Sequence, residues 1–410
     1  MLTRPKNLIK CQISGNKNLL SILNLGYLPP VNQLKKIGYN ENSETKYLTE
    51  LLFCKKSFLI QLKTILDKKI IFPKNYPYTS SATKILRDNF INLYNEIRNN
   101  FNFRKNDLVI DIGSNDGNLL DKFKNYFQVL GVTPETIGKL AIKKGIPTLI
   151  RYFDSRAVNL ILKKKGKASI ITATNVFAHI DKVHSVVKQI KRLMKKDSIF
   201  VTESHYVLPL IKELQYDTIY HEHLRYYSLK SLNYLFKINN LEIFDAKKIP
   251  THGGSIRVYC GFKGKYQIKP IVSKIIKEEE NFLNVKNLKN FNKKVFLSKI
   301  KLFSLLSKIL KKDIKIAGIS APSRASTLIN FVGLNREIID CIFEIKGSKK
   351  IGHYLPGTRI PIVEEKIQDL KKYKYLIIFS WHIYNEIIIN LKKKGFKGKF
   401  IIPLPFPKIT

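Results

Sequence analysis

Leu108-Val-Ile-Asp-Ile-Gly-Ser-Asn-Asp-Gly117 is the stretch that decides the fold. Its first five residues have the apolar, β-branched character of a buried strand, and the run Leu119-Leu-Asp-Lys-Phe123 behind it is helix-like. Between them, Gly113 and Gly117 let the backbone pass close to a ligand, while the first turn of the helix offers unpaired N–H groups. Strand, glycine turn and helix in this order predict a ligand-binding α/β unit.

Strand-like runs of the same kind recur on the C-terminal side of this stretch. They lie at residues 129–132, 169–173 and 198–202, and lysine-rich amphipathic segments separate them. Alternating strands and helices are typical of a doubly wound parallel sheet. Two further β-like runs, at 241–244 and 255–259, are expected to close that sheet.

A second α/β unit is expected nearer the C-terminus. Residues 270–312 predict one or two charged amphipathic helices, which would connect the two units. Apolar strands are then expected at 314–319, 338–343 and 375–379. Both larger units therefore look Rossmann-like.

The first ~75 residues read differently, as a short, turn-rich lobe. A linker rich in proline and small polar residues follows it, and a helix is predicted from about Ala82 to Arg98. We therefore expect three domains, at residues 1–75, 76–265 and 266–410.

The chain is strongly basic, because 73 Lys and Arg residues stand against 31 Asp and Glu residues and give a net charge of +42. The lysines are spread over the whole length, and Ile, Asn, Phe and Tyr are abundant beside them. AT-rich codons produce such a composition, and a functional site for a polyanion is the alternative. A phosphate-bearing small substrate is compatible with both interpretations.

Apolar runs, the N-terminal residues and the cysteines indicate in which cellular compartment the protein is expected. No apolar run approaches the ~20 residues that span a bilayer, and the residues from Met1 to Lys6 lack the apolar core of a secretory signal. Four scattered cysteines are not the framework of a disulfide-rich secreted domain. We expect a cytoplasmic protein that does not insert into membranes.

The glycine turn matches neither GxGxxG nor GxxxxGK[ST]. A carboxylate on the strand, Asp111, followed by Gly-x-x-x-Gly resembles the cofactor turn of class I methyltransferases; an ordinary strand–helix turn is the alternative. The resemblance implies S-adenosylmethionine as cofactor, with a binding site made of Asp111, Gly113, Asn115, Asp116, Gly117, Thr133 and Asn175. Those enzymes usually carry Asp or Glu at the end of the second strand, where this chain has Thr133, with Glu135 two residues on.

The tetrapeptide Tyr220-His-Glu-His223 concentrates groups that exchange protons. His179 and His252 lie in two further polar stretches. Histidine is the side chain best suited to remove a proton near neutral pH. Acid–base catalysis is one interpretation; a metal site, for which no third ligand stands at close spacing, and a structural hydrogen-bonded cluster are the others.

Several longer motifs together resemble one family. They are Asp111–Gly117, Asn175–His179, Asp217–His223, Thr251–Ser255, Ala321–Asn330, Tyr354–Thr358 and Ser380–His382. This combination resembles the three-domain, S-adenosylmethionine-dependent C-methyltransferases of deoxysugar biosynthesis over nearly the whole chain. The resemblance implies an α/β protein with a class I methyltransferase Rossmann-like domain. A small zinc-ribbon-like lobe would precede that domain, and a Rossmann-like α/β domain would follow it.

Members of this family transfer a methyl group to C3 of a dTDP-linked 4-keto sugar, so the expected partner is a nucleotide-diphosphate sugar. The resemblance implies that His223 removes the C3 proton and that Glu222 orients it. It also implies that Tyr220, His179 and Tyr78 line the substrate and support the enolate oxygen. A proton next to a ketone is acidic enough for a positioned imidazole once the enolate is stabilised, and no metal is needed for this step.

The C-terminal domain is expected to close over the nucleotide sugar. Ser323 and Arg324 follow a strand, and arginine pairs well with phosphate oxygens; a surface arginine beside a helix-capping serine is the alternative. The other candidate substrate contacts are His252, Gly253, Tyr354, Trp381 and His382. A turn with structural duties alone is the alternative for the stretch around Tyr354.

The family usually carries zinc in its first domain on two Cys-x-x-Cys pairs. Here the corresponding stretches read Cys11-Gln-Ile-Ser14 and Cys54-Lys-Lys-Ser57, so that serine replaces the second cysteine of each pair. Structural zinc takes four nitrogen or sulfur ligands, and two thiolates do not close that tetrahedron. We expect a lobe that folds without zinc, with Ser14 and Ser57 hydrogen-bonded at the former metal position. Cys260 and Cys341 are expected to be small core residues.

Three other functions remain open at this point. The charge suggests a nucleic-acid methyltransferase, although Asn175-Val-Phe-Ala178 stands where such enzymes often carry Pro-Pro-Tyr or Pro-Pro-Phe. With Thr133 in the cofactor site, the same base would also serve an epimerase or isomerase of a nucleotide keto-sugar. A binding or assembly role without catalysis is the third alternative.

Overall fold

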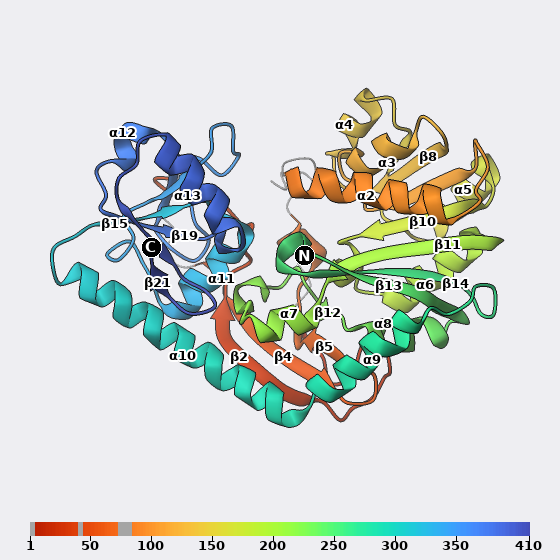
Figure 1. Cartoon of the computed structure of the whole chain (residues 1–410), viewed down its shortest axis with the longest axis horizontal. Coiled ribbons are helices and arrows are strands. Elements are labelled where there is room, and N and C mark those ends of the chain that lie inside the picture. Colours follow the sequence, from red (N-terminus) through yellow and green to blue (C-terminus); the bar gives the residue numbers. More distant parts are fainter. Residues whose placement is uncertain (1–4, 40–43, 73–83) are drawn as a thin grey trace.

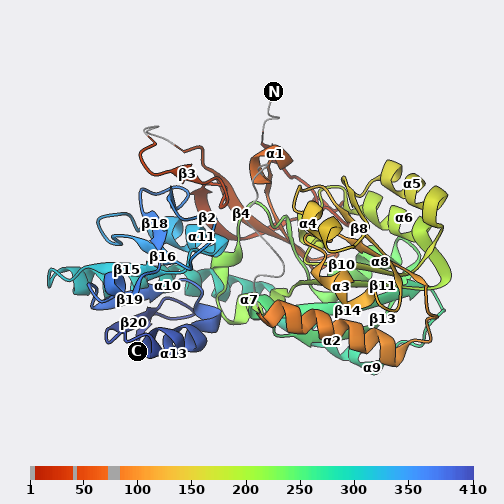
Figure 2. The ribbon, with the colours of Figure 1, turned by 90° about the horizontal axis from the view of Figure 1, so that it is seen from above.

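The computed structural model describes residues 5–39, 44–72 and 84–410. Two larger α/β units form two arms, and strands from the N-terminal lobe lie at the base between them (Figure 1). Seen from above, the N-terminal strands again stand between the two units (Figure 2). The N-terminal lobe therefore contacts both arms, and residues that lie between the arms come from all three parts of the chain.

The middle unit is built on a seven-stranded sheet with strand order β13-β14-β11-β10-β7-β8-β9. The five strands from β9 to β11 are parallel, and β14 and β13 complete the sheet as antiparallel strands. The strands are β7 (Leu108–Ile112), β8 (Gln128–Thr133), β9 (Thr148–Ile150), β10 (Ala168–Thr174), β11 (Met194–His205), β13 (Leu241–Ile249) and β14 (Ser255–Phe262). The predicted parallel sheet is confirmed, and so are the two runs expected to close it.

Helices cover both faces of this sheet (Figure 1). They are α2 (Lys84–Asn100), α3 (Asn118–Phe123), α4 (Gly138–Lys143), α5 (Ser155–Lys165), α6 (Val183–Leu193), α7 (Val207–Lys212) and α8 (Leu229–Lys237). Their ends follow local sequence signals. Asp154 caps α5 by accepting from the Ala157 N–H, and Gly166 with φ +76° ends that helix. Ser228 and Ser231 form a capping box at the start of α8.

The N-terminal lobe contains β1 (Lys6–Asn7), β2 (Leu20–Leu28), β3 (Lys35–Lys36), β4 (Tyr47–Cys54), β5 (Leu59–Leu62), β6 (Thr64–Ile65) and α1 (Lys68–Ile71). Its four-stranded sheet has the order β12-β5-β4-β2, and β12 (Arg225–Tyr226) comes from the middle unit. Conversely, β3 pairs with β17 of the C-terminal unit. The lobe thus shares a strand with each arm. Two-residue strands have no periodicity, so the sequence could not predict this exchange.

The C-terminal unit has an eight-stranded sheet, β21-β20-β19-β15-β16-β18-β17-β3. Its own strands are β15 (Ile316–Ile319), β16 (Ile342–Glu344), β17 (His353–Tyr354), β18 (Pro361–Glu364), β19 (Tyr375–Ile378), β20 (Lys399–Ile402) and β21 (Lys408–Ile409). The five strands from β18 to β20 in this order are parallel. After β15 the chain adds β16 and β18 on one side of that strand, and then β19 and β20 on its other side. In open parallel sheets this switch point, at the carboxyl ends of β15 and β19, is where ligands bind.

Two helices, α9 (Pro270–Phe282) and α10 (Val285–Leu310), connect the arms and confirm the connector predicted for 270–312. The long α10 runs beneath the C-terminal unit (Figure 1). It contacts α11 (Ser323–Val332), β2 and α7, so it touches all three parts. The remaining helices are α12 (Ile367–Leu370) and α13 (Tyr384–Lys393).

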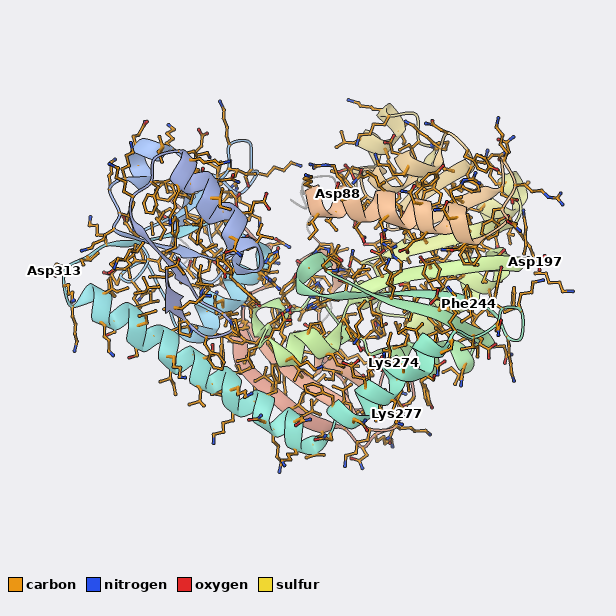
Figure 3. All side chains as sticks on the ribbon, in the orientation of Figure 1. Asp88, Asp197, Phe244, Lys274, Lys277 and Asp313 are labelled. Carbon is orange, nitrogen blue, oxygen red and sulfur yellow. The ribbon has the colours of Figure 1, made fainter. Side chains whose placement is uncertain are left out.

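Side chains that end in nitrogen atoms extend into solvent around the whole outline of the molecule, from Asp313 at one end to Asp197 at the other (Figure 3). Lys274 and Lys277 on α9 are among the exposed ones. Inside, Cys260 is buried as expected for a core residue, and so is Cys341. No helix in the described part of the chain has both the length and the apolar character needed to cross a membrane.

Candidate active site

The glycine turn lies at the carboxyl end of β7, at the centre of the seven-stranded sheet. Gly113, Asn115 and Gly117 all have left-handed backbones, with φ of +76°, +50° and +79°. A Cβ at position 113 would lie 2.2 Å from Cγ2 of Val176, which follows β10. Glycine is therefore required there both by conformation and by close packing.

Polar side chains around this turn are buried. Asp111 is 3 % exposed and accepts a 2.7 Å hydrogen bond from Thr172, and burial raises the pKa of its carboxyl to about 7. Asp116 is equally buried and lies 3.4 Å from the Lys144 ammonium. Two buried groups, Ser114 Oγ and Asn118 Nδ2, have no hydrogen-bond partner within the described chain. Groups of this kind at a glycine turn are available to a bound ligand.

The end of β8 carries a carboxylate that the sequence motif did not assign. Thr133 Oγ1 donates to Glu135 Oε2 at 2.5 Å, so the Glu135 carboxylate lies against Thr133 at the end of β8. Thr133 itself is fully buried, whereas Glu135 is partly exposed. The sequence shows that Glu135 lies two residues after Thr133, but it does not show that the Glu135 side chain bonds back to Thr133.

The segment after β10 leads from the glycine turn to the histidines. Asn175 has a left-handed backbone with φ +58°, and its N–H donates to the Glu203 carbonyl at 2.8 Å. Val176 packs against Gly113, and the short helix η2 (Phe177–His179) begins at the next residue. The ring of His179 then lies 5.1 Å from that of His223. The candidate cofactor turn and the candidate base are therefore neighbours.

His223 has a defined hydrogen-bond partner. Its Nδ1 lies 2.9 Å from the carbonyl oxygen of Thr218, and because a carbonyl only accepts, the proton of the neutral ring sits on Nδ1. The lone pair is then on Nε2. Burial and the neighbouring His179 lower the pKa of His223 well below its usual range, which keeps the ring neutral at physiological pH. The ring of Tyr220 lies against that of His223, with a centroid distance of 4.3 Å and an interplanar angle of 33°.

His179 is held in the same way. Its Nδ1 lies 2.7 Å from the carbonyl oxygen of Glu222, so this ring also carries its proton on Nδ1. Burial lowers the pKa of His179 as well. The candidate catalytic residue Tyr78 lies outside the described residues.

Glu222 contacts the N-terminal lobe. Its Oε1 accepts a 2.6 Å hydrogen bond from Asn32 Nδ2, and Asn32 Oδ1 accepts one of 2.9 Å from Ser323 Oγ. One residue from each of the three parts of the chain thus takes part in a single hydrogen-bonded chain. The partner on Nδ1 of His223 is the Thr218 carbonyl, and the orienting role expected of the Glu222 side chain stays a prediction.

A second polar cluster faces this one from the C-terminal unit. Arg324, at the start of α11, lies 3.3 Å from Asp217 Oδ2 through Nε, and its Nη1 lies 3.0 Å from Nδ1 of His382. Trp381 donates from Nε1 to the same Asp217 oxygen at 2.7 Å. Because the guanidinium donates, His382 accepts and is neutral; burial and Arg324 lower its pKa to about 3. Ser320 Oγ bonds Ser380 Oγ at 2.8 Å across the switch point.

His252 and His205 belong to the same region. His252 has a left-handed backbone, with φ +57°, and its buried Nε2 lacks a partner within the described chain. Burial and Arg324 lower the pKa of His252 to about 4 and that of His205 to about 3. Gln215 joins them, since it bonds His205 at 3.0 Å and the Gly253 carbonyl at 2.6 Å. A strained residue beside unpaired buried groups is typical of a functional site.

Comparison with known proteins finds family matches for three stretches of the chain. Residues 87–246 match the family "Methyltransferase domain", and residues 250–405 match "C-methyltransferase C-terminal domain". Residues 11–72 match "Putative zinc binding domain". The chain is 27 % identical over 408 residues to the C-methyltransferase NovU from Streptomyces niveus, which covers 98 % of this chain and 96 % of that protein.

The chain is a three-domain C-methyltransferase.

The solved structures to which this methyltransferase is similar include other methyltransferases. One is an S-adenosylmethionine-dependent methyltransferase from Clostridium acetobutylicum, with 17 % identity and a TM-score of 0.35 over 45 % of this chain and 94 % of that one. Another is magnesium protoporphyrin IX methyltransferase from Synechocystis with bound SAM, with 11 % identity and a TM-score of 0.32 over 42 % and 78 %.

The first domain of the methyltransferase brings its two Cys-x-x-Ser stretches together. Cys11 Sγ lies 3.2 Å from Ser57 Oγ, and Cys54 Sγ lies 3.4 Å from Ser14 Oγ. The hydrogen bonds expected of the two serines are thus confirmed. Two thiols and two hydroxyls do not match the ligand set of structural zinc. Among the residues that the structure describes, no three His, Cys, Asp or Glu side chains are grouped as metal ligands.

One candidate residue of the methyltransferase, Tyr354, contacts another domain, and two residues of the site were not identified from the sequence. Tyr354 lies on β17, where its hydroxyl accepts from the Gly38 N–H at 3.3 Å, so its contact is with the N-terminal lobe. Asn32 and Asp217 were not singled out from the sequence as site residues. Asp217 opens the motif that contains His223, which is a signal for it, whereas Asn32 stands alone in a turn-rich lobe.

Proposed function

We propose that this C-methyltransferase adds a methyl group to a ring carbon of a nucleotide-diphosphate-linked 4-keto-deoxysugar, with His223 as the base. The observation that carries the proposal is the contact between His223 Nδ1 and the Thr218 carbonyl, because it leaves Nε2 with a lone pair at the meeting point of the domains. The similarity to NovU, a C-methyltransferase, supports transfer to carbon.

The proposed proton transfer uses only residues of this region. Nε2 of His223 takes the proton next to the ketone, and the C–H electron pair passes to the ketone oxygen as an enolate. Tyr220, whose ring lies against that of His223, is the candidate donor to that oxygen. The lowered pKa of His223 makes it a weak base in isolation, so stabilisation of the enolate is essential to the step.

The residues at the end of the seven-stranded sheet fit S-adenosylmethionine. The unpaired Ser114 Oγ and Asn118 Nδ2 offer polar partners at the glycine turn, and Glu135 with Thr133 offers a carboxylate for the ribose hydroxyls. Asp111, Asp116 and Asn175 shape the rest of the turn. When bound, this cofactor supplies an electrophilic methyl group to a carbanion.

The nucleotide end is assigned to the C-terminal domain. Ser323 and Arg324 stand at the N-terminus of α11, beside the switch point where β15 and β19 end. Helix N-termini and guanidinium groups both favour phosphate oxygens. His252, Trp381 and His382 surround Arg324 and would contact the same ligand.

Proton exchange without methyl transfer tests the base directly. The enzyme is incubated in D₂O with a dTDP-4-keto-6-deoxy sugar and S-adenosylhomocysteine, and proton NMR follows the signal next to the ketone. We expect the wild type to exchange this proton for deuterium and H223Q not to do so. Exchange accompanied by inversion of the carbon next to the ketone, which would yield a second sugar, would favour the alternative function as an epimerase or isomerase. Equal exchange rates in the two proteins would refute His223 as the base.

A further inference from the structure

The residues between Tyr216 and His223 are held from outside their own domain. Asp217 lies in the short helix η3 (Tyr216–Thr218), yet its carboxylate binds Trp381 and Arg324 of the C-terminal domain. All three side chains are buried, with exposed fractions between 1 % and 7 %. An ion pair this well shielded from water resists separation far more than a surface pair does.

A second contact lies on the other side of Thr218. The carbonyl oxygen of Ile219 accepts a 3.3 Å hydrogen bond from Thr327 Oγ1, which is buried one turn along α11 from Arg324. Thr218 therefore stands between two residues, Asp217 and Ile219, that the C-terminal domain holds in place.

The carbonyl of Thr218 is the group that fixes the tautomer of His223. It accepts from His223 Nδ1 at 2.9 Å and from the Tyr226 hydroxyl at 3.3 Å. Its direction depends on the backbone angles of residues 218 and 219. A rotation that withdrew this oxygen would remove the reason for the proton to stay on Nδ1.

We propose that Asp217 and Thr327 are positioning residues, whose contacts across the domain interface aim the Thr218 carbonyl at His223 and so keep the lone pair on Nε2. The inference rests on the proposed function, in which the lone pair on Nε2 of His223 accepts the proton of the substrate. The C-terminal domain then has two duties, because Arg324 both holds Asp217 and faces the site assigned to the nucleotide diphosphate.

Loss of these positioning contacts should lower kcat more than it raises the KM for the substrate. Thr327 contacts a backbone carbonyl and has no part in the assigned phosphate site, so T327V should leave the KM for the nucleotide sugar within about twofold. Its kcat should fall by about tenfold or more, since a wrong histidine tautomer disables a general base. D217N should have a larger effect, because it leaves Arg324 without its buried counter-charge.

Nitrogen-15 NMR of the full chain labelled in histidine tests the inference without depending on turnover. The two ring nitrogens report which of them carries the proton, and the spectrum of H223Q identifies the signals of His223. The matched control is S326A, which removes a buried hydroxyl that bonds the Pro356 carbonyl from the neighbouring position on α11. Circular dichroism confirms folding, and T327V carries the test if D217N does not fold.

We expect wild type and S326A to show His223 protonated at Nδ1, and T327V and D217N to show a mixture of tautomers with reduced kcat. Folded T327V that keeps both the Nδ1 tautomer and the wild-type kcat would overturn the inference. A mixed tautomer with undiminished kcat would uphold the positioning role and refute His223 as the base. Failure of the inference and failure of the proposed function are thus separate results.

Discussion

The carbonyl oxygen of Thr218 lies 2.9 Å from Nδ1 of His223 and leaves Nε2 of that ring as the site of the lone pair. Glu222, the neighbouring carboxylate, instead accepts from Asn32 of the N-terminal domain. A backbone carbonyl orients the imidazole without adding a negative charge beside it. The ring therefore stays a weak base whose action depends on the acidity of the bound substrate.

Removal of this imidazole should abolish methyl transfer while sparing ligand binding. H223Q keeps a polar side chain of similar reach, and we expect kcat to fall by about 10²–10⁴-fold, the range for loss of a general base. Binding of dTDP, measured by calorimetry, should change by less than about twofold. A kcat within tenfold of the wild-type value would contradict the assignment.

The proposed cofactor site is tested with one carboxylate from the site and one from the surface of α9. E135Q removes the charge next to Thr133, and we expect the Kd for S-adenosylmethionine to rise by about tenfold because a charge-assisted hydrogen bond is lost. E280Q, on the surface of α9, is the control and should bind like the wild type. Equal calorimetric affinities for all three proteins would show that Glu135 does not contact the cofactor.

Four thiols in place of two should create a zinc site in the N-terminal domain. The two Cys–Ser hydrogen bonds already bring the four positions together, so the double variant S14C/S57C has the ligand set of structural zinc. We expect one zinc per chain by elemental analysis and a Tm raised by several degrees, with both effects reversed by a chelator. The wild type should carry no stoichiometric zinc, and finding one zinc per chain in it would contradict the account.

The histidines His205 and His252 should lose stabilising free energy on mild acidification. The pKa of His205 is lowered to about 3 and that of His252 to about 4, so between these values and about 6.5 each histidine binds more protons in the unfolded chain than in the folded one. The contribution of these two histidines to the free energy of unfolding is therefore greatest above pH 6.5 and decreases as the pH falls below it, by at most about 1.4 kcal/mol per pH unit for each histidine.

Urea titrations at pH 7.5, 6 and 5 measure this slope. H252N should make it shallower, because one of the groups that must take up a proton on unfolding is gone. A slope that H252N leaves unchanged would show that His252 is not held neutral; the total slope does not decide this, because the raised pKa values of the Asp111 and Glu279 carboxyls, both about 7, act in the opposite direction.

Much of the fold was accessible from the sequence, since it rests on local periodicity. The run from Leu108 to Gly117 predicted the central strand and its turn, and residues 270–312 predicted one or two helices, of which the structure contains two. The proximity of His179 and His223 followed from family motifs. Burial and tautomers did not, because they depend on which carbonyl groups face each ring.

The contacts between domains were beyond the reach of sequence reasoning. Asn32 meets Glu222 across 190 positions, and Trp381 meets Asp217 across 164, with no local pattern that marks either pair. The strands β12 and β3, each two residues long, join the domains without any periodicity to reveal them. Only the docking of folded units brings such residues together.

The most direct test of the central claim is to supply S-adenosylmethionine labelled with carbon-13 in its methyl group together with a dTDP-4-keto-6-deoxy sugar. Carbon–proton correlation NMR of the product then shows which atom carries the label. The account predicts a labelled methyl group bonded to a ring carbon next to the ketone with the wild type, and none with H223Q. A label on oxygen, or equal labelling of carbon by H223Q, would contradict it.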